Sequence, residues 1–322
     1  MQNKKILITG FSGFVARYFL QYLYNENIYA EVCGIDIKDP DYHYESYHDK
    51  LSIQFHKVNL LETSDLNALF LKFVPDYILH LASFSSVAYS WKNPVESFRN
   101  NTNIFLNLVM CVKEVNPKCR ILSIGSSEEY GNVEESDLPL TETKIPNPNS
   151  PYAVARVSQE MLSKLFSESY GMKIIMTRSF NHIGPYQDER FVVPSFIRRI
   201  LDISESGKTQ GSIETGDTTI IRDFVDVRDV VKAYYLLLKD GIPGEVYNIC
   251  SGRGISLQSI IDEVASYLHV HITTNVNPQF VRPNDIKKII GSSDKIKRKL
   301  EWTSQVPLQV TLQDMVECMR SK

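Results

Sequence analysis

The first chemically informative feature of this sequence is a tyrosine with an arginine one helical turn away. Tyr152 and Arg156 lie four positions apart in SPYAVAR, so a helix would project both from the same face. Ser126 lies earlier, in GSSEEYG, and its hydroxyl can orient a substrate alcohol while the tyrosine takes the alcohol's proton. A positive charge beside a phenol favours the phenolate. Ser126, Tyr152 and Arg156 therefore form a candidate set for proton transfer.

The stretch GSSEEYG also offers a candidate base. Ser127 and Glu128 follow directly after a predicted strand at 120–125. In a doubly wound sheet, ligands bind beyond the carboxyl ends of the strands, so Ser126, Ser127 and Glu128 would face one cleft. A carboxylate held close to a substrate can remove a proton, and Glu128 is our candidate for that role. Glu129, by contrast, is predicted to be a solvated carboxylate.

A phosphate-binding turn is predicted near the N-terminus, in ILITGFSGFVARYFL. Gly10 permits a tight turn after the first strand, Gly13 lets the backbone approach a pyrophosphate, and the following helix offers unpaired amides. Asp36 ends the second strand 26 residues after Gly10, where its carboxylate can accept hydrogen bonds from an adenosine ribose. It would repel a 2′-phosphate, although the charge of Lys38 would soften that repulsion. The sequence therefore predicts a dinucleotide site that prefers NAD to NADP.

A parallel sheet must position these residues. Short β-branched runs alternate with helical stretches through the first half of the chain, which is typical of βαβ units. The candidate strands cover residues 5–9, 31–36, 53–58, 77–81, 120–125 and 173–178. Beyond residue 178 the alternation weakens and proline and glycine mark a looser region. We therefore predict an α/β fold with a doubly wound (Rossmann) parallel sheet and a second, smaller mixed α/β lobe for the substrate.

The two predicted domains interleave along the chain. The dinucleotide-binding domain would span residues 1–178, and the substrate lobe would span 179–322. The stretch 246–249, in EVYNIC, has the pattern of a strand that returns to the first sheet, so a segment at about 219–250 would rejoin the first domain.

Two predicted helices carry more apolar surface than one neighbour can cover. Apolar residues repeat at spacings of three and four on two faces of the stretch 95–115, and the stretch after Tyr152 shows the same pattern. One face of each helix would cover the sheet, and the other would contact a second subunit. A homodimer through this helix pair is our expectation, and burial of both faces within one chain is the equal alternative.

The composition excludes several other functions. A net charge of −3 and a pI near 6.2 leave no broad positive surface, so nucleic acid is not an expected partner. No stretch is apolar enough to span a membrane and the N-terminus lacks a signal peptide, so we expect a cytoplasmic protein. The five cysteines are scattered without a CxxC pair, which favours reduced thiols over a metal or redox site.

Seven motifs in order give this chain a resemblance to a known family. They are TGFSGFVA, LASFSSV at 81–87, GSSEEYG, SPYAVAR, FNHIGP at 180–185, RDFVDVRD at 222–229 and VRPND at 281–285. The set covers nearly the whole chain and resembles the extended short-chain dehydrogenases/reductases, which act on nucleotide-activated sugars. Within that superfamily, the chain is most similar to the GDP-mannose 4,6-dehydratases and the GDP-4-keto-6-deoxyhexose reductases.

The resemblance implies which residues meet the cofactor and the substrate. The residues implied to contact NAD, in addition to those discussed above, are Ser12, Phe14, Val15, Asn59, Leu60, Leu81, Ala82, Ser83 and Asn101. The residues implied to contact a nucleotide sugar, with a GDP-sugar favoured, are Ser85, Ser86, Asn181, Val192, Arg222, Arg282 and Asp285. The serines would meet the hexose, Asn181 the diphosphate, and the two arginines the phosphates or the nucleotide ribose, because a planar guanidinium binds anions in a bidentate manner.

This chain departs from the family pattern at three places. The family has lysine where this chain has Arg156, which keeps the charge but cannot lose a proton at neutral pH. Asn59 replaces an aspartate near the adenine, and an amide can still donate and accept there. Ile104 and Phe105 replace a Gly-Thr pair near the cofactor. The arginine is compatible with a proton that is shuttled and returned locally, and it also suits a catalytically silent dinucleotide-sensing protein.

The resemblance leaves several reactions open. In a 4,6-dehydratase, C4 of the hexose is oxidised by loss of a hydride to the nicotinamide, and the resulting ketone acidifies the C5 proton. Water is then lost from C6, and the same hydride returns to C6. Net redox change is zero, so the enzyme can keep NAD bound, and Asp36 favours this reaction over a reductase that draws on NADPH. The resemblance implies that Tyr152 and Ser126 handle the C4 hydroxyl, Glu128 takes the C5 proton, and Ser127 or a water relays a proton to the C6 oxygen. A GDP-4-keto-6-deoxyhexose reductase and a nucleotide-sugar 4-epimerase are the alternatives.

Overall fold

The computed structural model describes residues 1–281 and 286–321. Its centre is a seven-stranded sheet in the order β10-β6-β5-β4-β1-β2-β3, and every neighbouring pair in it is parallel. The strands are β1 (Lys4–Thr9), β2 (Ala30–Asp36), β3 (Leu51–Lys57), β4 (Tyr77–His80), β5 (Arg120–Ser126), β6 (Lys173–Ser179) and β10 (Val246–Ile249). The six strands predicted in the first half, and the returning strand at 246–249, are confirmed within about two residues at each end.

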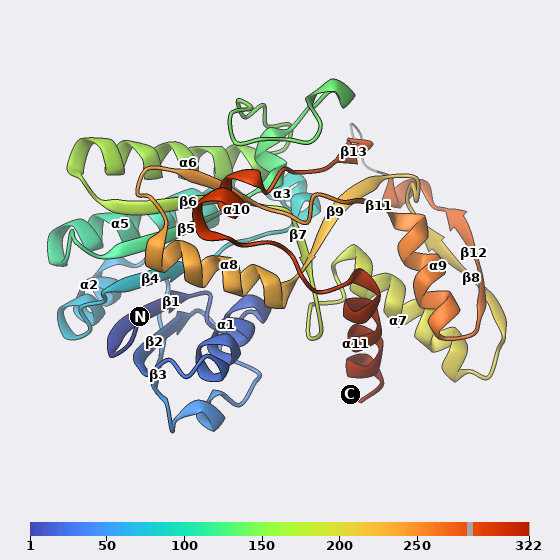
Figure 1. Ribbon diagram of the computed structural model, residues 1–322, viewed down its shortest axis with the longest axis horizontal. Helices are drawn as coiled ribbons and strands as arrows, with labels where there is room; N and C mark the ends of the chain where they lie inside the picture. Colours follow the sequence, from blue (N-terminus) through green and yellow to red (C-terminus); the bar gives the residue numbers. More distant parts are fainter. Residues whose placement is uncertain (282–285, 322) are drawn as a thin grey trace.

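Helices cover both faces of this sheet (Figure 1). One face carries α1 (Phe14–Asn25), α8 (Val227–Asp240) and α10 (Asp294–Leu300), whose apolar residues share a buried cluster with β1, β2 and β5. The opposite face carries α2 (Thr63–Lys72), α5 (Ile104–Val115) and α6 (Pro151–Tyr170), which bury a second cluster. Because both faces are covered, the strands carry near-continuous apolar runs. This arrangement is the doubly wound α/β fold that the sequence predicts.

The helix predicted at 95–115 has an interruption. The chain forms α3 (Val87–Lys92) and α4 (Pro94–Phe98), then a π-helical turn at Arg99–Asn103, and then α5. The π turn inserts an extra residue into the helical repeat, and such turns are frequent at functional sites. The buried Asn101 lies within it. The chain is therefore α-helical on both sides of this turn, as the apolar spacing predicts, but the α-helical repeat is interrupted at Arg99–Asn103.

The second lobe lies at the right of Figure 1. Its strands form one small sheet and one pair: β7 (Asn181–Ile183), β9 (Ile221–Asp226), β11 (Gly254–Ser256) and β13 (Lys288–Ile289), and β8 (Gln210–Thr215) with β12 (His271–Val276). Its helices α7 (Val192–Glu205), α9 (Leu257–Tyr267) and α11 (Leu308–Arg320) share an apolar cluster that is separate from those of the large sheet. We retain the domain division at residue 178 as a proposal, with α8 and β10 returning to the first sheet.

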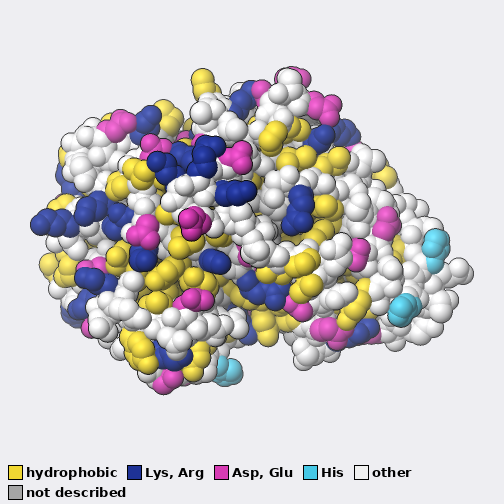
Figure 2. Space-filling view, in the orientation of Figure 1, with side chains coloured by type: hydrophobic (Ala, Val, Ile, Leu, Met, Phe, Trp, Pro, Cys, Tyr) yellow, Lys and Arg dark blue, Asp and Glu magenta, His cyan; other side chains and the backbone are white. Residues whose placement is uncertain are grey.

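The surface has a mixed charge. On the face shown in Figure 2, basic and acidic side chains are interspersed with hydrophobic ones. In the part of the chain that the structure describes, no helix combines the length and the apolar character needed to cross a bilayer.

Candidate active site

The turn between β1 and α1 is built around Gly10. Its φ of +68° lies in the left-handed region that favours glycine, and a Cβ there would lie 2.8 Å from the backbone nitrogen of Ala82. Gly13 donates its N–H to the Gly10 carbonyl at 3.0 Å, and α1 begins at the next residue. The N-cap residue of α1 is Gly13, and among the described residues no side-chain hydrogen bond caps this end of the helix. The turn therefore leaves helical amides available to an anion, as a pyrophosphate requires.

Asp36 is held against this turn. Its Oδ2 accepts the N–H of Ser12 at 2.9 Å, and its Oδ1 accepts the N–H of Ile37 at 2.7 Å. The Ser12 hydroxyl donates to the carbonyl of Lys38 at 2.6 Å. Each carboxylate oxygen can still accept a further hydrogen bond, because it has a second lone pair. Phe14 and Val15, the first residues of α1, are half-buried beside the turn. This arrangement fits the adenosine and pyrophosphate parts of a dinucleotide.

The loop after β4 forms the opposite side of the turn. Ala82 donates its N–H to the Thr9 hydroxyl at 3.1 Å, which ties this loop to the end of β1. Leu81, Ala82 and Ser83 are half-buried, whereas Ser85 and Ser86 are exposed. The Ser86 hydroxyl accepts the N–H of Tyr89 at 3.1 Å and so caps α3.

Asn101 supports this loop from beneath. Its side chain accepts the N–H of Phe84 at 3.2 Å and donates to the carbonyls of Phe84, at 3.3 Å, and Ser97, at 2.7 Å. Asn59 follows β3, where its Oδ1 accepts the N–H of Leu61 at 3.0 Å, and Leu60 is buried. The side chain of Asn101 therefore hydrogen-bonds to the protein's own backbone and fixes the conformation of the loop after β4.

Tyr152 and Arg156 meet in the first turns of α6. Both are buried, and the Nε–H of Arg156 donates to the Tyr152 hydroxyl at 3.2 Å. The same guanidinium donates from Nη1 to the Ile124 carbonyl at 3.0 Å and to Oε1 of Gln159 at 2.7 Å. Ser150 caps the helix by accepting the N–H of Ala153 at 3.1 Å, which fixes where α6 begins. Arg156 therefore supports the phenol and also links α6 to β5.

The charge of Arg156 also reaches a buried histidine. His80, at the end of β4, lies 2.8 Å from the Thr9 hydroxyl through Nδ1. Burial, and secondly the nearby Arg156, lower the pKa of His80 to about 3. The ring is thus neutral at physiological pH, so Arg156 is the cation beside Tyr152.

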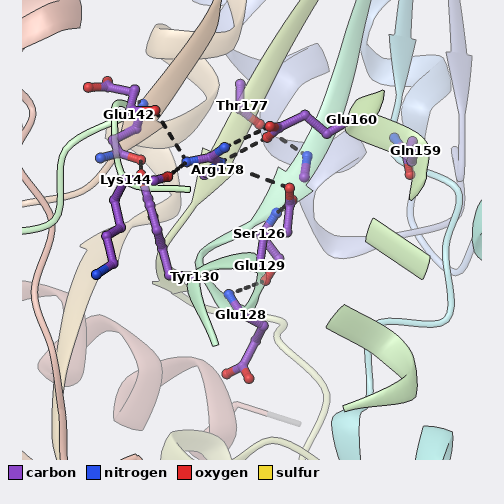
Figure 3. A network of polar contacts seen from close by, with 12 residues as sticks. Ser126, Glu128, Glu129, Tyr130, Glu142, Lys144, Gln159, Glu160, Thr177 and Arg178 are labelled. Carbon is purple, nitrogen blue, oxygen red and sulfur yellow. Dashed lines mark hydrogen bonds and ion pairs between the residues drawn. The ribbon is translucent and has the colours of Figure 1, made fainter. Parts of the chain in front are cut away.

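The end of β5 presents the predicted catalytic stretch. The Ser126 hydroxyl accepts the N–H of Glu128 at 3.2 Å, which begins a short 3₁₀ turn at Ser127–Tyr130. Ser127 is buried and Glu128 is half-buried. Figure 3 shows the Glu128 carboxylate directed away from the polar network that lies behind it.

The prediction for Glu129 is wrong. Its side chain is completely buried, with its Oε1 2.7 Å from the Ser126 amide and its Oε2 4.0 Å from Nε of Arg178. Sequence reasoning assigned it to the surface because it follows a strand end, but the 3₁₀ turn rotates its side chain inward.

The predicted substrate residues line the start of the second lobe. Asn181 begins β7 and is half-buried, and Val192 begins α7 and is exposed. Arg222, in β9, donates to the carbonyls of Ile286 at 2.7 Å and Ile221 at 3.0 Å. The remaining two predicted residues, Arg282 and Asp285, lie outside the described residues.

His182 lies beside the glycine turn, although sequence reasoning did not single it out. Its ring stacks on Phe14 with centroids 6.1 Å apart, so it joins the glycine turn to the second lobe. Burial lowers the pKa of its imidazole to about 4, against the opposing effect of a hydrogen bond with the Phe180 backbone. The available signal was its position in FNHIGP, beside Asn181.

Comparison with known proteins decides the family. The family model described as GDP-mannose 4,6 dehydratase matches residues 7–315, which includes both lobes. This chain belongs to that family. The GDP-mannose 4,6-dehydratase family is an enzyme family of nucleotide-sugar dehydratases and reductases, so the resemblance found in the seven motifs is confirmed.

Individual relatives in and around this family differ in reaction. The chain is 29% identical to a GDP-6-deoxy-D-mannose reductase from Pseudomonas aeruginosa, with 99% of this chain and 98% of that protein covered. It is 27% identical to a GDP-mannose 4,6-dehydratase from Yersinia enterocolitica, with 97% and 93% covered. A solved structure of RMD from Pseudomonas aeruginosa, complexed with NADPH, has a TM-score of 0.84 and 28% identity over 99% and 98% of the two chains. The family is therefore clear, whereas the choice between dehydration and reduction is not made by similarity.

Proposed function

We propose that this chain is an NAD-dependent nucleotide-sugar 4,6-dehydratase that acts on a GDP-linked hexose or N-acetylhexosamine. The product would be the 4-keto-6-deoxy sugar, formed with loss of one water and no net redox change. The observation that carries the proposal is Glu128, a half-buried carboxylate on the turn that begins at Ser126. A base at this position is needed to remove the C5 proton, and a 4-epimerase has no use for it. Asp36, which disfavours the 2′-phosphate of NADPH, supports the dehydratase over the reductase.

Two features support NAD as the bound dinucleotide. Gly10 lies too close to the Ala82 backbone to hold a side chain, and Gly13 lies close to the Gly10 carbonyl, as a pyrophosphate cradle requires. The carboxylate of Asp36 stands at the end of β2, where it favours ribose hydroxyls and repels a 2′-phosphate. The solved structure of the Pseudomonas aeruginosa protein contains NADPH, which argues against a preference for NAD. The affinities of this protein for NAD and NADPH should therefore be measured side by side.

The chain's own residues would divide the proton transfers. NAD, held by the Gly10–Gly13 turn and Asp36, would supply a hydride acceptor and donor for the exchange between C4 and C6. Tyr152, supported by the Nε–H of Arg156, would take the proton of the C4 hydroxyl while Ser126 orients that hydroxyl. Glu128 would remove the C5 proton, and Ser127 would relay a proton to the departing C6 oxygen.

Arg156 can take the place of the family's lysine in the proposed proton transfer by Tyr152. Its three hydrogen bonds hold the guanidinium in place, and it stays protonated throughout the cycle. Tyr152 would take the C4 hydroxyl proton in the oxidation, and because the C4 ketone is kept in the product, that proton would return to the substrate at C5 when hydride is returned to C6. The arginine therefore serves as a fixed charge, and a silent dinucleotide sensor is disfavoured because Tyr152 and Arg156 remain in hydrogen-bonding contact.

The deciding experiment separates the reactions by what they consume. The protein would be incubated with GDP-, UDP- and CDP-sugars without added reductant, and mass spectrometry would follow the loss of one water. We expect dehydration of a GDP-sugar. Consumption of NADPH with a 4-keto sugar, and no dehydration, would select the GDP-4-keto-6-deoxyhexose reductase, whereas an isobaric product would select the 4-epimerase.

Glu128→Gln tests the proposed base directly. The amide keeps the size of the side chain but cannot remove a proton at C5, so we expect dehydration to fall by roughly 10²- to 10⁴-fold with the dinucleotide still bound. Substrate depletion by mass and dinucleotide affinity by titration are the two measurements. The matched control is Glu114→Gln, which changes an exposed carboxylate on α5. Full activity of Glu128→Gln would remove Glu128 from the mechanism.

We also propose that the protein is a homodimer through α4 and α6. Within the described part of the chain nothing covers the outer face of these helices: Val95 is 73% exposed, Met161 68% and Leu165 52%. Beside them lies a groove of about 620 Å³ whose apolar lining includes Phe98 and Val154. A contiguous apolar face of this kind is typical of an interface. The alternative of burial within one chain therefore does not hold for this face.

The dimer is tested by mass in solution. Met161→Asp places a charge at the centre of the proposed interface, so we expect sedimentation to change from a dimer to a monomer while the circular dichroism of the chain stays the same. Lys164→Asp on the same helix, outside the apolar face, is the control. A wild-type protein that sediments as a monomer at micromolar concentration would contradict the proposal. The cytoplasmic location stays a prediction.

A further inference from the structure

A second carboxyl group lies directly behind the proposed base. Glu129 follows Glu128 in sequence, but Figure 3 shows its side chain directed into the protein, toward Arg178. Its Oε1 accepts the backbone N–H of Ser126 at 2.7 Å. Gly125 makes room for this contact, because a Cβ at residue 125 would lie 2.3 Å from that same oxygen. The carboxyl group is thus built into the end of β5.

Arg178 and Glu160 complete the cluster from β6 and α6. The guanidinium donates to both oxygens of Glu160, at 2.8 Å from Nε and 2.7 Å from Nη2. It also donates to the Lys144 carbonyl at 3.0 Å and lies over the Tyr130 ring, 4.7 Å from its centroid. The contacts of Arg178 with Glu160 are therefore much shorter than its ion pair with Glu129, which is 4.0 Å long.

The charges of this cluster do not balance if both carboxyl groups are ionised. One guanidinium faces two carboxyl groups, and Glu160 takes the bidentate contact and keeps some exposure to solvent. Oε2 of Glu129 is buried and has no N–H or O–H donor among the described residues, although it lies beside the Glu160 carboxyl group. A second buried charge without a partner is strongly unfavourable. Burial, and then the charge of Glu160, raise the pKa of Glu129 well above its usual range, which favours its protonated form.

We propose that Glu129 is a positioning residue of the active site, which holds the Ser126–Glu128 turn in place as an uncharged carboxyl group bonded to the Ser126 amide. This proposal takes from the proposed function only the reaction that Glu128 performs. The role of Glu129 in holding the turn does not depend on that reaction. Its physical basis is the short 3₁₀ turn, which has a single turn of hydrogen bonds and is anchored at one end by the reciprocal Ser126 and Glu129 contacts. Without Glu129, the half-buried Ser126 amide would lose this acceptor, and the turn would relax.

The first test compares two variants of residue 129. Glu129→Gln keeps an acceptor for the Ser126 amide, a donor toward Glu160 and a neutral side chain, so we expect kcat within about threefold of the wild type. Glu129→Met keeps the volume but has no such acceptor, so we expect kcat to fall by about tenfold or more with KM and dinucleotide affinity unchanged. The kcat would be normalised to folded protein, measured by dinucleotide binding, so that a loss of folded protein alone does not lower it.

The second test does not use activity. The folded protein binds a proton at Glu129 that the unfolded chain releases above about pH 4.3. Because the pKa is raised on folding, this group stabilises the fold at low pH, and that contribution is lost as the pH rises from about 4.3 toward the folded pKa. The groups that face Glu129 are Glu160 from α6 and Arg178 from β6. We therefore expect urea denaturation to show Glu129→Gln gaining stability relative to the wild type between pH 5 and pH 8.

The control and the contrary results are specific. Glu168→Gln alters an exposed carboxylate on α6 and should show no such gain between pH 5 and pH 8. A Glu129→Met enzyme with wild-type kcat, or a Glu129→Gln protein whose stability follows that of the wild type at every pH, would overturn the proposal. The ratio of variant kcat to wild-type kcat can be measured for dehydration or for NADPH-dependent reduction. A failure of the dehydratase assignment would therefore be seen in the panel of nucleotide sugars, and not in the kcat ratios of the residue 129 variants.

Discussion

Tyr152→Phe is expected to lower kcat by roughly 10²- to 10⁴-fold, the range for loss of a general acid or base. The phenylalanine ring has the same shape, so the buried site should stay packed. Arg156 would lose one acceptor but keep the Ile124 carbonyl and Gln159, so its charge would stay in place. Steady-state turnover of the GDP-sugar, measured beside dinucleotide affinity, separates loss of chemistry from loss of binding.

The control for this prediction is a second buried tyrosine. Tyr234, in α8, has its hydroxyl 2.8 Å from Oγ of Ser179. Tyr234→Phe should cost about 1 kcal/mol of stability, as for a typical hydrogen bond, without a comparable fall in kcat. A Tyr152→Phe enzyme that retains more than a tenth of the wild-type kcat would mean that the proton leaves the C4 hydroxyl by another route.

Gly10→Ala is expected to abolish dinucleotide binding at micromolar concentrations. The residue must adopt φ +68°, which costs a non-glycine residue about 1–2 kcal/mol. The added Cβ would also lie 2.8 Å from the Ala82 backbone nitrogen, which cannot move without breaking its bond to Thr9. The loop after β4 would then be displaced from the site. Titration of NAD into the purified variant measures the effect.

Gly171→Ala isolates the cost of the backbone conformation. Gly171 ends α6 with φ +64°, close to that of Gly10, but a Cβ there would meet no atom of the described residues within 4 Å. It should therefore show the loss of stability without any loss of NAD binding. If Gly10→Ala binds NAD as tightly as Gly171→Ala does, the close approach of Ala82 is not what forms the site.

The fold could be predicted because its pattern is local. β-branched runs and helical periodicities recur over short windows, and the parallel sheet follows from their alternation. The prediction was wrong where a local pattern is broken by a contact from elsewhere: the π turn at Arg99–Asn103 lets the side chain of Asn101 support the Phe84 backbone. Nothing in the spacing of apolar residues encodes that contact.

The sequence by itself determined the glycine turn, the Tyr152–Arg156 pair and the Ser126–Glu128 stretch, because each depends on residues close together in the chain. Only the tertiary structure decided that Arg156 bonds both the phenol and β5, and that Glu129 is buried rather than solvated. The protonation of Glu129 depends on Glu160 and Arg178, which reach it from α6 and β6. Burial and charge are properties of the surroundings in space, so residues distant in the chain set them.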